Sequence, residues 1–398
     1  MKLEKLEQII RTGILVLAGS MMFSLFIAQA VTILLILLWL IKLVVFKKAD
    51  LRNNPFTYPF IAFVIARIIS VFLSTDISQS VQTLNKEIFF YPLFFIVVDC
   101  FPIEDKKYFK WFVVVLVSSA LVASIYGSVS VLIGATHRAA STTSGFYTLG
   151  TFLTVVLAFL LVIGSDRYFI PSKLVWLLAL IIVVVGILFT FNRIHWALIV
   201  LLFFVFGVFR ERKFVLIVSI LAAIIVIAVP MFRERLLDLL FFSRNLSDRD
   251  VLLQGASMIY SKHPLFGFGP LTFREIFPLF EKLMDQNVSS WHNDYLQVYI
   301  ESGAVGLVAF LWLGFSIFYC GIEIFLSKYV DTYSKDIAFA LLLAMVVLYA
   351  TGIVGTFIFS PISSLLFQLL LGILALTYRK LKLKNQLDSQ NLSELGME

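Results

Sequence analysis

The sequence has few charged residues and almost no cysteine. Only 14% of its 398 residues are charged, whereas a soluble domain carries about 25% because its surface has to be hydrated. This shortage excludes a water-soluble enzyme built around a buried core. The two cysteines, Cys100 and Cys320, cannot form a disulfide framework, and they do not combine with the four histidines in any zinc-type spacing.

Signals for nucleotides and metals are lacking as well. The chain has no glycine-rich loop of the type that cradles phosphates, and its expected cytoplasmic loops are too short to hold a nucleotide-binding domain. A nucleotide-sugar donor is therefore disfavoured. The triplet Asp248-Arg249-Asp250 matches the Asp-x-Asp pattern of metal-dependent glycosyltransferases, but a three-residue pattern is common by chance. We expect no metal site and no cofactor.

Long apolar runs are abundant. Hydrophobic residues make up 60% of the chain, 41 of them Phe, and the mean hydropathy is +0.97. Bounded by charges or turn residues, the runs number about twelve, each near the length that crosses a bilayer as a helix, and they lack the alternation of barrel strands. The sequence predicts an all-α integral membrane protein. Its spans are expected at 12–28, 30–46, 56–73, 88–101, 111–134, 146–164, 173–190, 195–209, 214–231, 303–326, 337–357 and 361–378.

Positive charge is distributed unevenly between the two sides. With the N-terminus in the cytoplasm, 21 of the 32 Lys and Arg residues fall in inside segments, whereas short outside loops contain only Lys86, Arg138 and Arg193. This pattern follows the positive-inside rule and places both termini in the cytoplasm. The net charge of +7 is therefore a topology signal, and we expect no nucleic-acid partner.

The polar sequence is concentrated in one outside loop. We predict nine spans over 1–231, this large loop over 232–302, three spans over 303–378 and a basic cytoplasmic tail over 379–398. Within the loop, 250–260 should be helical, with Asp248 or Ser247 as its N-cap. Gly267 and Gly269 should shape a turn in which backbone approaches backbone, and a last helix should start near Ser290.

Several polar residues are candidates for chemistry. Arg138 and Arg193 lie on the disfavoured side, where an arginine fork could grip a phosphate, although snorkelling from a helix end is the alternative. Arg67 is the one ionisable residue central in a span, and a structural salt bridge or snorkelling explains it at least as well as catalysis. His292 is the best acid or base candidate, although a loop histidine is often structural.

Several segments resemble the O-antigen ligase and polymerase family. The stretches Arg249-Asp-Val-Leu-Leu-Gln-Gly-Ala and His263-Pro-Leu-Phe-Gly-Phe-Gly-Pro are similar to the family's large loop. The block His292-Asn-Asp-Tyr-Leu-Gln and the spacings His292-x10-Gly303 and Arg244-x10-Gly255 resemble its signatures, and Asn192-Arg193 resembles its Ser-Arg with Asn in place of Ser. The topology also agrees over the whole chain, while motif detail is confined to 190–305.

The resemblance implies a fold, a reaction and a location. It implies a GT-C-like glycosyltransferase in the bacterial inner membrane, with its active site periplasmic. An O-antigen ligase transfers a glycan from undecaprenyl pyrophosphate to the lipid A-core oligosaccharide in lipopolysaccharide biosynthesis, by metal-independent, inverting transfer. The implied partners are therefore the lipid-linked donor, the lipid A-core acceptor and the bilayer.

The resemblance also implies residue roles. Arg193 and Arg249 would bind the pyrophosphate, with Arg138 and Arg244 as further candidates, because arginines can stabilise the leaving group where a metal is absent. His292 would activate or position the acceptor. Three more residues would orient the acceptor or pack the site: Asn293, Gln297 and Glu301.

Two rival functions remain open. A polysaccharide polymerase shares the fold and the donor but joins lipid-linked repeat units, and it could work with a chain-length regulator. The single dominant outside loop and the modest chain length favour the ligase. A transporter of lipid-linked glycans is the third reading, but transporters tend to have paired broken helices and polar midplane residues, and the spans here contain almost no ionisable residues.

Overall fold

The structure is a computed structural model. It describes residues 2–51, 54–164, 166–170, 172–213, 248–328 and 330–394, and of residues 384–394 it describes the backbone alone. All regular elements within these ranges are helical. The span expected at 214–231 and the start of the large loop lie outside the described residues.

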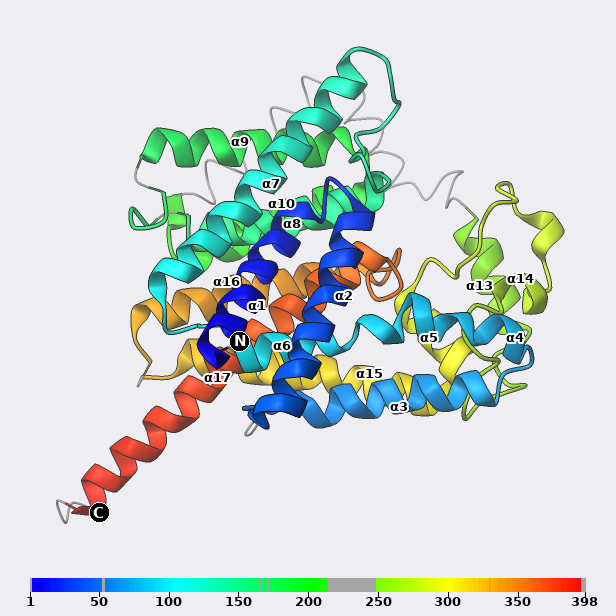
Figure 1. Cartoon of the computed structure of the whole chain (residues 1–398). Helices are drawn as coiled ribbons and strands as arrows, with labels where there is room; N and C mark the ends of the chain where they lie inside the picture. Colours follow the sequence, from blue (N-terminus) through cyan, green and yellow to red (C-terminus); the bar gives the residue numbers. More distant parts are fainter. Residues whose placement is uncertain are drawn as a thin grey trace.

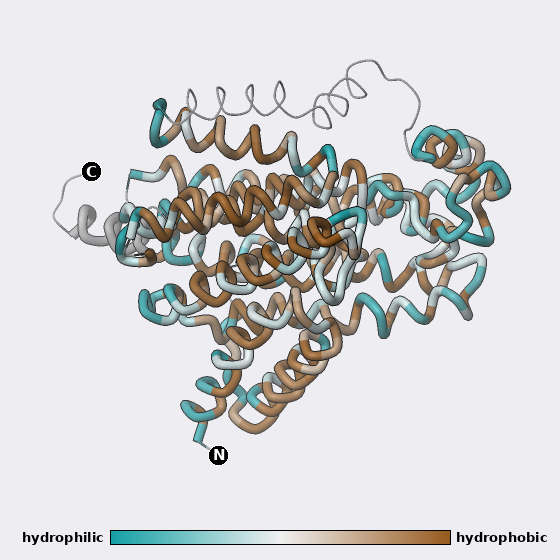
Figure 2. Tube along the Cα trace, turned by 90° about the horizontal axis from the view of Figure 1, so that it is seen from above, coloured by the Kyte–Doolittle hydropathy of each residue, from teal (hydrophilic) through white to brown (hydrophobic). Residues whose placement is uncertain are grey.

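Long apolar helices form the body of the molecule (Figure 1). Hydrophobic residues fill the middle of these helices and hydrophilic residues gather at their ends (Figure 2). Among the described residues, six helices are long and apolar enough to cross a membrane, and four shorter apolar helices accompany them. The all-α membrane fold is thereby confirmed. The main helices are α1 (Leu3–Ser20), α2 (Leu25–Ile41), α3 (Thr57–Phe72), α6 (Pro92–Cys100), α7 (Lys106–Leu132), α8 (Phe146–Val162), α9 (Lys173–Phe189), α10 (Arg193–Phe209), α15 (Asp294–Leu326), α16 (Thr332–Thr351) and α17 (Pro361–Glu394).

Two apolar runs form helices whose bounds differ from those expected. The run at 12–28 is split, because α1 ends at Ser20 and the side chain of Ser24 accepts a hydrogen bond from the Ile27 N–H at 3.2 Å, which caps α2. Hydropathy alone could not locate this break, since apolar residues lie on both sides of it. The run at 88–101 is the end of a longer helical stretch, Ile77–Cys100, which is long and apolar enough to cross a membrane. This stretch consists of α4 (Ile77–Ser80), α5 (Gln82–Lys86), η2 (Ile88–Phe90) and α6.

The described part of the large loop folds at one end of the bundle, beside α4 and α5 (Figure 1). It contains α13 (Arg249–Ser257), α14 (Phe273–Ile276) and η3 (Phe280–Lys282). Its small core includes Phe273, Phe277 and Trp291, and the ring centroids of both Phe residues lie 4.9 and 5.6 Å from that of Trp291. The loop is therefore a packed element.

Backbone hydrogen bonds join this loop to a break in α15. Gly303 has φ 63° and ψ −166°, a region open almost only to glycine. Around it, the Phe268 N–H donates to the Ile300 carbonyl at 2.8 Å and the Ala304 N–H donates to the Pro264 carbonyl at 2.8 Å. The loop thus satisfies backbone groups that the broken helix leaves open, as an apolar environment requires. Gly267 lies against the same backbone, where the sequence suggested a close approach.

We expect Gly303→Ala to lower the thermal unfolding midpoint of the detergent-solubilised protein. The backbone conformation alone should cost about 1–3 kcal/mol in an alanine, and a Cβ would lie 2.2 Å from backbone atoms of Leu265. The matched control is Gly145→Ala, because Gly145 has φ −66° and no neighbour within 4 Å of an added Cβ. Equal midpoints for the two variants would contradict this account of the break.

Candidate functional site

His292 lies at the point where the loop enters α15. Its φ is +48°, which is uncommon outside glycine and cannot continue a helix. The next residue, Asn293, is the N-cap, and its Oδ1 accepts a hydrogen bond from the Leu296 N–H at 2.9 Å. The last helix of the loop therefore begins at Asp294 and not near Ser290 as predicted, because capping and the backbone of His292 fix its start.

Arg249 is the first residue of α13 and is partly buried. One Nη2–H donates to the Val354 carbonyl at 2.7 Å, while the buried Nε–H has no hydrogen-bond partner among the described residues. Burial lowers the pKa of Arg249, nearby Tyr147 raises it, and Arg193 lowers it further by charge repulsion. The two guanidinium groups are thus electrostatic neighbours, and no carboxylate in the described chain is among the groups that shift the pKa of Arg249.

His292 is also affected by the charge of Arg249. Burial lowers the pKa of its imidazole, and the positive charge of Arg249 lowers it further, while Asp285 and Asp248 act in the opposite direction. The imidazole is therefore neutral at neutral pH. The charge of Arg249 on α13 is thus coupled both to that of Arg193 at the start of α10 and to that of His292 before α15.

The remaining arginines expected to bind phosphate lie in different surroundings from Arg249. Arg193 begins α10, and the side chain of Asn192 caps that helix by accepting from the Ile194 N–H at 3.4 Å, so Asn can serve where the resembling family has Ser. The guanidinium carbon of Arg138 lies 4.4 Å from the centroid of the Phe146 ring at the start of α8. Arg244 lies outside the described residues.

Two expected acceptor-binding residues lie in a buried ion cluster. The side chain of Gln297 donates to Glu301 at 3.0 Å, and Glu301 in turn accepts from Arg67 at 2.8 Å. Arg67 also forms two hydrogen bonds to Glu87, at 3.1 and 2.7 Å. All four side chains are at least nine-tenths buried. Arg67 is therefore part of a structural ion cluster that links α3, α15 and the segment before α6.

The side chain of Asn293 binds backbone groups on both sides. Its Oδ1 caps α15, and its Nδ2 donates to the Ile353 carbonyl at 2.8 Å. Both ends of the amide therefore hold backbone, which places Asn293 beside His292 as part of the support of the site.

The Asp248-Arg249-Asp250 triplet does not gather its carboxylates. Asp248 is buried, and its Oδ2 accepts from the Met284 and Asp285 N–H groups at 3.0 and 3.2 Å, whereas Asp250 is exposed. Asp248 thus joins the start of α13 to the backbone at residues 284–285. Within the described ranges, no group of three His, Cys, Asp or Glu side chains could hold a metal ion.

The sequence places the segment 351–357 in the span expected at 337–357, but α16 ends at Thr351 and the segment leads from it towards α17. Its carbonyl groups receive the hydrogen bonds from Arg249 and Asn293, which lie 105 and 60 residues earlier in the chain. The available signal was compositional: Thr351-Gly352 and Gly355-Thr356 interrupt an otherwise apolar region, and glycines in such a place allow close backbone approach.

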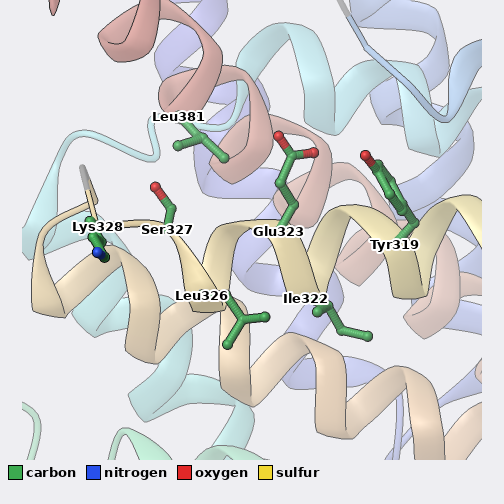
Figure 3. Close-up of a pocket in the computed structure, with 7 residues that line it drawn as sticks. All are labelled: Tyr319, Ile322, Glu323, Leu326, Ser327, Lys328 and Leu381. Carbon is green, nitrogen blue, oxygen red and sulfur yellow. The ribbon is translucent and has the colours of Figure 1, made fainter.

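An open pocket of about 470 Å³ lies elsewhere, at the far end of α15 (Figure 3). There Glu323 accepts hydrogen bonds from Tyr378 at 2.9 Å and Lys382 at 2.7 Å. The length of α15 separates this pocket from His292, so it is not part of the candidate site. Its lining residues are Tyr319, Ile322, Glu323, Leu326, Ser327, Lys328 and Leu381.

Comparison with known proteins agrees with the resemblance. No curated protein matches the chain. The family model described as O-antigen ligase matches residues 177–311, a stretch that includes Arg193, Arg249 and His292 and ends within α15. Over residues 177–311 the chain is therefore similar to the O-antigen ligase family.

Proposed function

We propose that this protein is an O-antigen ligase that transfers a glycan from undecaprenyl pyrophosphate to the lipid A-core oligosaccharide at the periplasmic face of the inner membrane. The family match supports a function of the O-antigen ligase or polymerase type. The donor, the acceptor, the orientation and the residue roles are the proposal.

The observation that carries the proposal is the surroundings of Arg249, whose buried Nε–H has no partner among the described residues and whose charge is repelled by that of Arg193. An anion with several oxygens would relieve both costs, since arginine forks bind phosphate groups with charge-assisted hydrogen bonds. A pyrophosphate leaving group has this chemistry.

His292 acts on the acceptor as the general base. A neutral imidazole can accept the proton of an acceptor hydroxyl as the hydroxyl oxygen attacks the anomeric carbon. The bond from that carbon to the pyrophosphate oxygen breaks on the opposite face, which inverts the anomeric configuration. The negative charge that develops on the pyrophosphate is stabilised by the two arginines without a metal ion.

We expect Arg193→Ala, Arg249→Ala and His292→Ala each to reduce glycan transfer about 100-fold or more, because each removes a charge or proton acceptor needed in the transition state. Transfer is measured with purified protein and lipid-linked donor, and membrane insertion should be unchanged. The control is Arg274→Ala, an exposed arginine of the same loop. Native transfer rates in the three test variants would refute the assignment.

The pH profile should follow His292. The neutral imidazole is the active form. Because its pKa is lowered from 6.5, transfer should fall only at a pH below 6.5. Asp285→Asn removes a negative charge that raises the pKa, and it should therefore shift the acid limb to lower pH. Glu281→Gln, on the same loop but not among the charges acting on His292, serves as the control. A shift to higher pH in Asp285→Asn would exclude His292 as the titrating base.

Product identity separates the ligase from the polymerase. Purified protein is given labelled lipid-linked donor with either lipid A-core or a second lipid-linked repeat as acceptor, in excess chelator. We expect label in lipid A-core and retained activity. Label only in lengthened lipid-linked glycan would establish the polymerase, and loss of transfer that a divalent ion restores would overturn the metal-independent mechanism.

A further inference from the structure

Four successive carbonyl groups of the segment 351–357 accept hydrogen bonds from the elements around the candidate site. Tyr147 donates to the carbonyl of Thr351, and the Asp294 N–H donates to that of Gly352 at 2.7 Å. Asn293 donates to the carbonyl of Ile353 at 2.8 Å and Arg249 to that of Val354 at 2.7 Å. One short segment therefore contacts α8, α13 and the start of α15.

Asp294 fixes this segment from the side of His292. Asp294 is fully buried, and its two carboxylate oxygens accept from the Thr356 hydroxyl at 2.7 Å and from the Phe357 N–H at 2.8 Å. Together with its own N–H, Asp294 makes three hydrogen bonds to the segment. A buried carboxylate that loses its hydrogen-bond partners costs free energy. Asp294 therefore keeps the segment in place.

Tyr147 and Gly355 fix the segment from the opposite side. A Cβ on Gly355 would lie only 2.1 Å from the Tyr147 ring, so the aromatic ring rests directly on the glycine backbone. The same ring makes an edge contact with His195 at a centroid distance of 5.2 Å. His195 is fully buried in the first turn of α10, and its Nε2 lies 3.1 Å from the Thr151 hydroxyl. The contact extends the support to the helix that begins with Arg193.

We infer that the segment 351–357 positions the arginines and His292 relative to one another, with Gly355 and Asp294 as its positioning residues. This inference rests on the proposed function. The segment touches no reacting atom in the proposal. It acts through Arg249, whose guanidinium it orients by a carbonyl group, and through the start of α15, which carries His292. Small displacements of such groups are costly in catalysis.

The first test is a double-mutant cycle on the binding of undecaprenyl pyrophosphate without a glycan. Gly355→Ala should displace Val354 and weaken binding about 10-fold in the native background. In an Arg249→Ala background the same change should have no further effect, because residues that act through one another are not additive. A purely structural defect would weaken binding by the same factor in both backgrounds, and that result would overturn the inference. Gly145→Ala is the control, and its affinity should equal that of the native protein.

The second test uses the rate of glycan transfer and does not depend on Gly355→Ala folding. Asp294→Asn can keep both hydrogen bonds, with its oxygen facing the Phe357 N–H and its nitrogen facing the Thr356 hydroxyl, and should retain kcat within about two-fold. Asp294→Ala loses both and should lower kcat between about 10- and 100-fold. Equal kcat in both variants, whether high or low, would overturn the positioning role.

The two proposals fail in different ways. If the native protein shows no Arg249-dependent binding of undecaprenyl pyrophosphate and no transfer, the proposed function is overturned and this inference with it. If the native protein binds and transfers while Gly355→Ala and Asp294→Ala match it, the inference alone is overturned.

Discussion

Backbone N–H and C=O groups that are buried away from water need hydrogen-bond partners. This constraint applies to the break at Gly303 in α15, where residues 300–303 are buried and the segment 264–269 of the large loop pairs with the broken helix. The pairing fixes the loop on the bundle. Arg249 and His292, which lie near the two ends of the described part of the loop, are therefore held at one end of the membrane helices.

The arginines in this protein show how surroundings determine the role of a side chain. Arg67 is surrounded by Glu87 and Glu301, so its charge is balanced and it stabilises the packing of buried helices. Arg249 has a carbonyl group and a second guanidinium as neighbours, an arrangement that is poorly balanced without an anion. Buried charges are retained at a cost, and in the proposed function an anionic lipid carrier would offset that cost at Arg249.

The support of the candidate site is made largely of main-chain groups. The carbonyl groups of 351–354 and the N–H of Phe357 interact with side chains that arrive from three other parts of the fold. Backbone groups of a tightly packed segment move little, so they can hold flexible side chains such as arginine at fixed positions. Any residue type offers the same carbonyl group, and this explains why a search for polar side chains passed over the segment.

The sequence by itself determined the all-α membrane fold, because hydropathy and the distribution of charges are local properties that the bilayer imposes. It also indicated Arg193 and His292 as candidates, since polar residues are rare enough in this chain to stand out, whereas Arg249 became a candidate through the resemblance to a known family. It did not locate the break near Ser20 or the start of α15, which depend on single capping hydrogen bonds. Only the tertiary structure decided that Glu301 pairs with Arg67 and that the segment 351–357 supports the site. Such pairings join residues up to 234 positions apart, and no local pattern encodes which distant groups will meet.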